Sequence, residues 1–134
     1  MHATPLNIVL LDSISAISDA QAGTVVVSGS HGGSSAADFV LAASTRNVHA
    51  TIPAKPVLVV LNDAGVGKDQ AGIAALAMLQ AHGIACACYS HNSARIGEAQ
   101  DALDNGVISA LNETASDLGL SSGQTVLAAV KALS

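Results

Sequence analysis

Three short segments of this chain are rich in serine, histidine, aspartate, asparagine and glycine, the residue types that carry polar chemistry. They are Ser28 to Gly33, Asn62 to Asp69 and Ser90 to Gly97. Each follows an apolar run with the length and composition of a buried strand. In open parallel sheets, ligands bind beyond the carboxyl ends of the strands. We therefore expect the three segments to meet at one sheet edge and to form one small-molecule site there.

The first segment carries a serine between small residues, in Ser28-Gly29-Ser30-His31-Gly32-Gly33. It resembles the nucleophile elbow of the α/β-hydrolases, small-x-Ser-x-Gly, in which a tight turn joins a strand to a helix. The resemblance covers residues 24–43, with Ser28 in place of the usual first glycine. It implies that Ser30 is a nucleophile and that the His31 backbone N–H donates to an oxyanion.

The same resemblance implies that an acid and a base follow the serine, in the order Ser, Asp, His. Asp63 stands just after one expected strand and His91 just after the next. Ser30, Asp63 and His91 are thus the expected catalytic set, with His31 as the alternative base. A fainter likeness to caspase-like proteases, in His31-Gly32 and Asp63-Ala64-Gly65, carries no cysteine chemistry, because Gly65 stands where the cysteine would be.

The second and third segments also suit the binding of an anion. Gly65 to Lys68 would present backbone N–H groups ahead of a helix, and Lys68 and Arg95 would add positive charge. The segment is not a Walker A phosphate loop, because Asn62 and Asp69 replace the glycine and the hydroxyl residue that the motif needs. The expected ligand contacts are Gly29, Gly32, Gly33, Asn62, Gly65, Gly67, Lys68, Asp69, Ser93 and Arg95.

Most of these residues also have a purely structural interpretation. The glycines suit turns with positive φ, and Asn62 and Asp63 suit helix caps. Lys68 and Arg95 suit a solvated surface. Both interpretations stay open for each residue.

Metal and redox chemistry have little support in the sequence. No pair of histidines has the spacing of metal ligands, so we expect no metal and no cofactor. Only a convergence of His31, Asp63 and His91 from three loops would provide a ligand set. Cys86 and Cys88 alternate within an apolar run and are expected to be buried free thiols.

Composition excludes several classes of protein. Among 134 residues, 11% are charged and 1% aromatic, and the net charge is −5 with five scattered basic residues, so we expect no nucleic-acid binding. No apolar run is long enough to span a membrane, and a cytoplasmic location is the default expectation. Because so apolar a chain has few charges for its surface, we predict a homo-oligomer.

The elements that position these residues alternate along the chain. Expected strands lie near residues 7–11, 24–28, 56–61, 84–89 and, in short form, 107–109. Expected helices lie near 34–44, 70–82, 97–105 and 125–133. Such alternation predicts one α/β domain over residues 1–134, a three-layer sandwich with a mostly parallel sheet of four or five strands, Rossmann-like or flavodoxin-like. The helix over 70–82 is apolar nearly all round and should be buried on two sides.

Together these patterns favour a small cytoplasmic enzyme that acts on a small anionic metabolite at the carboxyl edge of its sheet, with serine-type hydrolysis as the leading chemistry. The alternative is a non-catalytic module or subunit that binds a small molecule or a nucleotide at the same edge. A third hypothesis is a scaffold whose glycine-rich loops are only structural.

Overall fold

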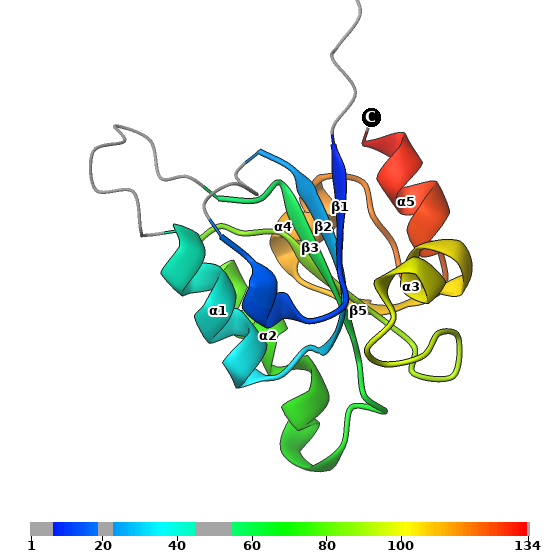
Figure 1. The fold of residues 1–134 in the computed structure, drawn as a ribbon, viewed down its shortest axis with the longest axis horizontal. Helices are drawn as coiled ribbons and strands as arrows, with labels where there is room; N and C mark the ends of the chain where they lie inside the picture. Colours follow the sequence, from blue (N-terminus) through cyan, green and yellow to red (C-terminus); the bar gives the residue numbers. More distant parts are fainter. Residues whose placement is uncertain (1–6, 19–22, 45–54, 134) are drawn as a thin grey trace, which may run out of the picture.

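The computed structural model of the chain describes residues 7–18, 23–44 and 55–133, apart from the side chains of residues 68 and 69. A five-stranded sheet lies at its centre, with helices on both faces (Figure 1). This arrangement confirms the predicted α/β sandwich. The strands are β1 (Ile8–Leu11), β2 (Val25–His31), β3 (Leu58–Asn62), β4 (Cys86–Tyr89) and β5 (Ile108–Leu111).

The strands lie side by side in the order in which they occur along the chain. β1 to β4 are parallel, and β5 pairs with β4 in the antiparallel direction. This order differs from the 3-2-1-4-5-6 order of Rossmann folds and from the 2-1-3-4-5 order of flavodoxin-like folds. The likeness to those folds therefore extends to the layers and not to the strand order.

One face of the sheet is covered by η1 (Ile14–Ala16), α1 (Ser34–Ser44) and α2 (Ala74–Gln80), with η3 (Lys68–Ile73) leading into α2. Each right-handed crossover from β1 to β4 moves one strand in the same direction, so their helical segments lie on the same face. α1 and α2 pack against each other there. The buried core on this side includes Val26, Ala37, Val40, Val59, Leu61, Leu79, Cys86 and Cys88.

The opposite face is covered by α3 (Ala99–Asn105), α5 (Val126–Ala132) and the short α4 (Glu113–Asp117). Figure 1 shows α3 and α5 on the far side of the sheet from α1 and α2. The second core includes Val25, Val27, Leu58, Val60, Ala87, Tyr89, Ala102, Val126 and Val130. Every fully buried central strand thus has apolar side chains on both faces, as parallel strands between two helical layers require.

Three elements differ from the sequence-based expectation. β2, expected near residues 24–28, continues to His31. The helix expected over 70–82 is a 3-10 segment up to Ile73 and an α-helix only from Ala74. α4 was not expected, and it begins after Asn112, whose side chain accepts a hydrogen bond from the Ala115 N–H. Both cysteines are buried free thiols, as predicted. None of the helices in the described residues has the length and apolar character needed to cross a membrane.

The connections after β3 and β4 leave the sheet in opposite directions. The chain passes from β3 to α2 on one face, and from β4 to α3 on the other. Such a divergence between neighbouring parallel strands opens a crevice at their carboxyl ends, which is the usual ligand position in open α/β sheets. A ligand site is therefore expected where β3 and β4 end.

Candidate functional site

Asp63 and His91 meet where β3 and β4 end. Asp63 directly follows β3, and His91 lies two residues beyond the end of β4. The His91 Nδ1 atom is 3.3 Å from Asp63 Oδ1. The Asp63 side chain is only 6% exposed, whereas that of His91 is 49% exposed. The predicted convergence of these two residues is therefore present, with the carboxylate buried and the imidazole open to solvent.

Ser109 joins the pair and was missed in the sequence. Its hydroxyl donates a hydrogen bond of 2.6 Å to Asp63 Oδ2. Because β5 is antiparallel, it begins at the edge where the parallel strands end, and Ser109 is its second residue. Only the direction of β5 brings Ser109 to this edge, and no motif around Ser109 signals that direction.

The Asp63 carboxylate is surrounded by donors. Oδ1 also accepts hydrogen bonds from the backbone N–H groups of Gly65 (2.8 Å) and His91 (3.0 Å). Burial alone would raise the pKa of Asp63, but the hydrogen bonds from Ser109, Gly65 and His91 outweigh it and hold that pKa below its ordinary value. Asp63 is thus an ionised anchor whose oxygens are engaged, rather than a free base.

The contact between Asp63 Oδ1 and His91 Nδ1 bears on the tautomer of the neutral His91 ring. A carboxylate beside Nδ1 favours the tautomer with its proton on Nδ1, which leaves the lone pair of Nε2 available. Gly65 lies beside the ring, since a Cβ atom there would be in ordinary contact with His91 Cε1 at 3.4 Å, and its φ of 74° favours glycine. An oriented, solvent-open imidazole of this kind can accept a proton from a substrate or a water molecule.

Ser30 lies elsewhere in the sheet. Its hydroxyl accepts a hydrogen bond of 2.9 Å from the N–H of Ile14, the first residue of η1. β2 is separated from β4 by β3, which means two strand spacings or about 10 Å. The structure therefore pairs Asp63 with His91, and Ser30 lies on a strand two spacings away from the strand that precedes His91. Ser30 also lies within β2, which continues to His31, and its φ is not positive.

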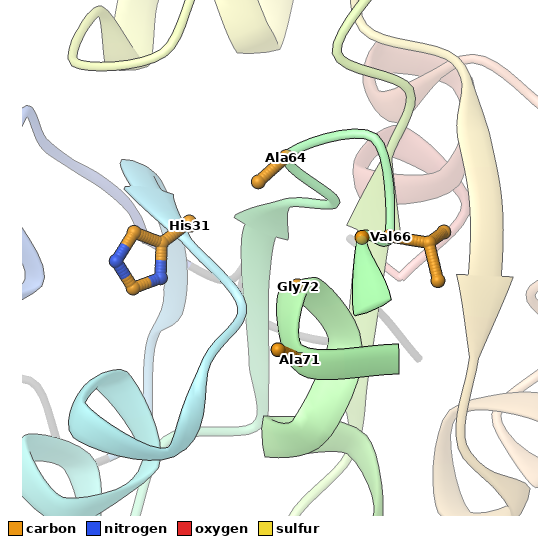
Figure 2. A pocket seen from close by; sticks show the side chains of 6 residues that line it. His31, Ala64, Val66, Ala71 and Gly72 are labelled. Atoms are coloured by element: carbon orange, nitrogen blue, oxygen red, sulfur yellow. The ribbon is translucent and has the colours of Figure 1, made fainter. Parts of the chain in front are cut away.

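His31 ends β2 in register with Asn62 of β3. Its Nδ1 accepts a hydrogen bond of 3.3 Å from the Gly33 N–H. The ring borders a pocket of about 260 Å³ (Figure 2), which is lined by His31, Ala64, Val66, Gly67, Ala71 and Gly72. His31 and His91 thus stand on different sides of the segment that follows β3.

That segment does not offer the expected anion nest. The N–H groups of Gly65, Val66 and Gly67 donate to Asp63 Oδ1, to the Asp63 carbonyl and to the Gly65 carbonyl respectively. Because these donors are engaged within the loop, they do not point toward an external anion. The side chains of Lys68 and Asp69 lie outside the described part of the structure, so their expected ligand contacts stay predictions.

The glycines divide into two groups. Gly65 and Gly67 have φ values of 74° and 73°, as the turn interpretation requires. Gly29, Gly32 and Gly33 do not have positive φ, so that interpretation is wrong for them. A Cβ on Gly29 would lie 2.7 Å from Gly97 Cα, and one on Gly32 would lie 2.8 Å from Cys88 Sγ. These glycines permit close packing between segments.

The other expected ligand contacts have structural partners. Asn62 is fully buried, donates to the Ala94 carbonyl and accepts from the Ala64 N–H. The Ser93 hydroxyl donates to the Ser90 carbonyl and accepts from the Val107 N–H. Arg95 lies 3.8 Å from Glu98 with its side chain 81% exposed. The expected roles of Asn62 and Ser93 as ligand contacts are therefore accompanied by structural roles, since both side chains bind backbone groups of neighbouring segments.

Within the described residues, no three histidine, cysteine, aspartate or glutamate side chains gather as a metal-binding group. His31 in particular does not join Asp63 and His91 in one cluster. Comparisons of the chain with protein-family models, with curated proteins and with solved structures found no match. The function therefore has to be inferred from the geometry of the site.

Proposed function

We propose that the protein is an enzyme acting on a small polar metabolite, with His91 as its general acid–base. The observation that carries the proposal is the contact of 3.3 Å between His91 Nδ1 and Asp63 Oδ1. Asp63 is buried and receives three further donors, so it is held rigidly behind the imidazole. The pair lies at the carboxyl ends of two neighbouring parallel strands, which is where ligands usually bind in open α/β sheets.

The chemistry follows from the orientation of the ring. His91 Nε2 would take a proton from water or from a substrate hydroxyl, and the imidazolium so formed would be stabilised by the Asp63 carboxylate. Hydrolysis by a water molecule that His91 deprotonates fits this geometry better than attack by Ser30, because Ser30 contacts Ile14 instead. We propose that the substrate is anionic mainly because the sequence places the positive charge of Lys68 in the segment after β3.

A second candidate is a non-catalytic module that binds a small molecule. The observation that favours it is the pocket beside His31, which lies on the opposite side of the loop from the Asp63–His91 pair. A binding module needs only this pocket. It would show ligand-dependent stabilisation without turnover.

A hydrolysis screen separates the two candidates. The purified protein would be assayed against panels of carboxylic esters, lactones and phosphate monoesters, together with His91→Gln and Asp63→Asn variants. The matched control is His82→Gln, because His82 is an exposed histidine at the other end of β4. We expect both site variants to lose at least about a hundredfold in rate. Turnover that survives in His91→Gln would exclude His91 as the acid–base.

We also propose that the protein forms a homo-oligomer. Five large apolar side chains are exposed on the described surface, namely Ile8, Leu10, Phe39, Ile96 and Leu118. Sedimentation velocity at several protein concentrations would measure the association state. A monomer at all concentrations would contradict the prediction.

A further inference from the structure

The two edges of the sheet differ in how they are covered. Along β5, the Ile108 N–H donates to the Gln124 carbonyl, and the Ile108 carbonyl accepts from the Gly123 N–H. Along β1, the other edge strand, no described segment forms such bonds on the outer side. In Figure 1, β1 runs between the two helical layers. Among the described residues, β1 is therefore the edge at which a further strand can pair.

The main-chain groups on the outer side of β1 belong to Ile8 and Leu10. The Val25 N–H donates to the Asn7 carbonyl, so Asn7 faces β2. Because the main-chain groups of successive strand residues point to alternate sides, Val9 also faces β2, whereas Ile8 and Leu10 face away from it. Within the described part of the chain, the N–H and C=O groups of these two residues have no partner on that side. Such a row of groups is able to bind an additional strand.

The side chains of Ile8 and Leu10 are apolar and exposed as well. They are 37% and 36% exposed, although both lie on the sheet face of their register partners Val25 and Val27, which are buried in the core there. β1 has no charged residue, proline or bulge, the features that usually keep an edge strand from pairing. An edge with free main-chain groups and uncharged side chains is complementary to another extended, apolar strand.

We propose that this partner is β1 of a second copy, paired in the antiparallel direction about a two-fold axis at Val9. Ile8 of each copy would lie opposite Leu10 of the other, and the two residues would exchange their main-chain hydrogen bonds. The exposed side chains of both copies would then form one apolar cluster on the same face. This pairing rests on the proposed homo-oligomer, whose surface it specifies, and it does not depend on catalysis by His91.

The position of Asp12 favours the antiparallel direction. Asp12 directly follows β1, and its Oδ1 accepts a hydrogen bond of 2.9 Å from the Ala99 N–H. In an antiparallel pair centred on Val9, the Asp12 carboxylates of the two copies lie at opposite ends of the paired strands. A parallel pair in register would place them side by side, where like charges repel. Because β1 itself is uncharged, it meets no repulsion from its own copy.

Sedimentation velocity over a range of protein concentrations tests the proposal with a Leu10→Lys variant. The lysine would place a cation among apolar side chains in both copies, so the association constant should fall at least tenfold. The matched control is Leu118→Lys, because Leu118 is 42% exposed and lies at the end of α4. We expect the control to associate like the unaltered protein. Unchanged association of Leu10→Lys would overturn the proposal.

Amide hydrogen exchange, followed by NMR, measures the pairing in the unaltered protein. The Ile8 and Leu10 N–H groups should be at least tenfold better protected in a dimeric sample than in a dilute monomeric one. Val9 and Leu11 are the internal control, because their N–H groups face β2 in both states, and their protection should change less. No rise at Ile8 and Leu10 in the dimer would overturn the proposal. Slow exchange of both in the monomer would also overturn it, because another part of the chain would then cover the edge.

A cysteine cross-link tests the register. Opposite residues at a non-hydrogen-bonded antiparallel position have Cα atoms about 4.5 Å apart, which is within the range for a disulfide. Val9→Cys should therefore form a covalent dimer when oxidised glutathione is added, and the control Leu118→Cys should not. Dimeric Val9→Cys that fails to cross-link would overturn the proposed register.

These experiments distinguish the surface from the homo-oligomer itself. A monomer at every concentration would overturn both the proposed homo-oligomer and the pairing at β1. A dimer that Leu10→Lys leaves intact would overturn the pairing at β1 and leave the homo-oligomer standing.

Discussion

At the scale of single residues, Asp63 organises the site because it receives donors from three parts of the chain. Gly65 comes from its own loop, His91 from the loop after β4, and Ser109 from β5. Position after a strand was enough to predict Asp63 and His91 from the sequence. The same reasoning selected Ser30, which lies on β2, two strands away from β4.

The lowered pKa of Asp63 makes a prediction about pH. A carboxyl group whose native pKa lies below its unfolded value contributes stability above the unfolded pKa, about 3.9 for aspartate. That stability is lost as the pH falls through the lower native pKa. Asp63→Asn should therefore reduce the free energy of unfolding by about 1.5–3 kcal/mol near pH 6. In urea titrations, the difference in free energy of unfolding between the two proteins should shrink below pH 4. A difference that stayed constant with pH would contradict the lowered pKa of Asp63.

Ser109 should control the ionisation of its neighbour. Removal of the hydroxyl in Ser109→Ala deletes the bond of 2.6 Å to Asp63 Oδ2, so the Asp63 pKa should rise while the fold loses about 1–2 kcal/mol. The matched control is Ser122→Ala, whose exposed hydroxyl makes only a contact of 3.5 Å to the Ser109 carbonyl. NMR titration of the Asp63 carboxyl carbon gives the readout. An unchanged titration in Ser109→Ala would show that the serine has no electrostatic role.

At the scale of elements, the sequence pattern predicted α1 with its observed bounds, residues 34–44, and the other strands and helices only approximately. It failed where the outcome depends on contacts between distant segments. The helix expected over 70–82 begins with a 3-10 turn because Gly72 must pack below the carbonyl groups of Asp63 and Val66. The direction of β5 is likewise decided by its pairing with β4 and not by its own residues.

Close contact between β2 and the segment before α3 gives a prediction at this scale. Gly97 donates to the Gly29 carbonyl, and a Cβ on Gly29 would overlap the backbone of Gly97 and Glu98. Gly29→Ala should therefore reduce the free energy of unfolding by about 2–3 kcal/mol, because the backbone at Gly97 and Glu98 would have to move. Gly119→Ala is the control, since Gly119 has a φ of 100° but no neighbour within 4 Å, and it should cost about 1 kcal/mol. Chemical denaturation would compare the two, and equal losses would contradict the packing argument.

At the scale of the whole molecule, the direction of the crossovers determines where the site lies. Four parallel strands added in one direction place η1, α1 and α2 on one face, and the chain must then change faces to cover the other. The change occurs after β4, so the β3 and β4 connections diverge at the point where Asp63 and His91 lie. The alternation of strands and helices predicted the three layers. The strand order was not predictable, because it depends on how all the strands and helices pack against one another.

The same strand order predicts a gradient of stability across the sheet. β3 lies at its centre with all five residues buried, whereas β1 is an edge strand with Ile8 and Leu10 exposed. Native-state hydrogen exchange should show β3 amides opening only with global unfolding, and β1 amides opening at a free energy about 2 kcal/mol or more below it. Equal protection of the two strands in a dilute sample would contradict this gradient. Protection of β1 that rises with protein concentration would instead show that a second copy covers this edge, as the predicted homo-oligomer allows.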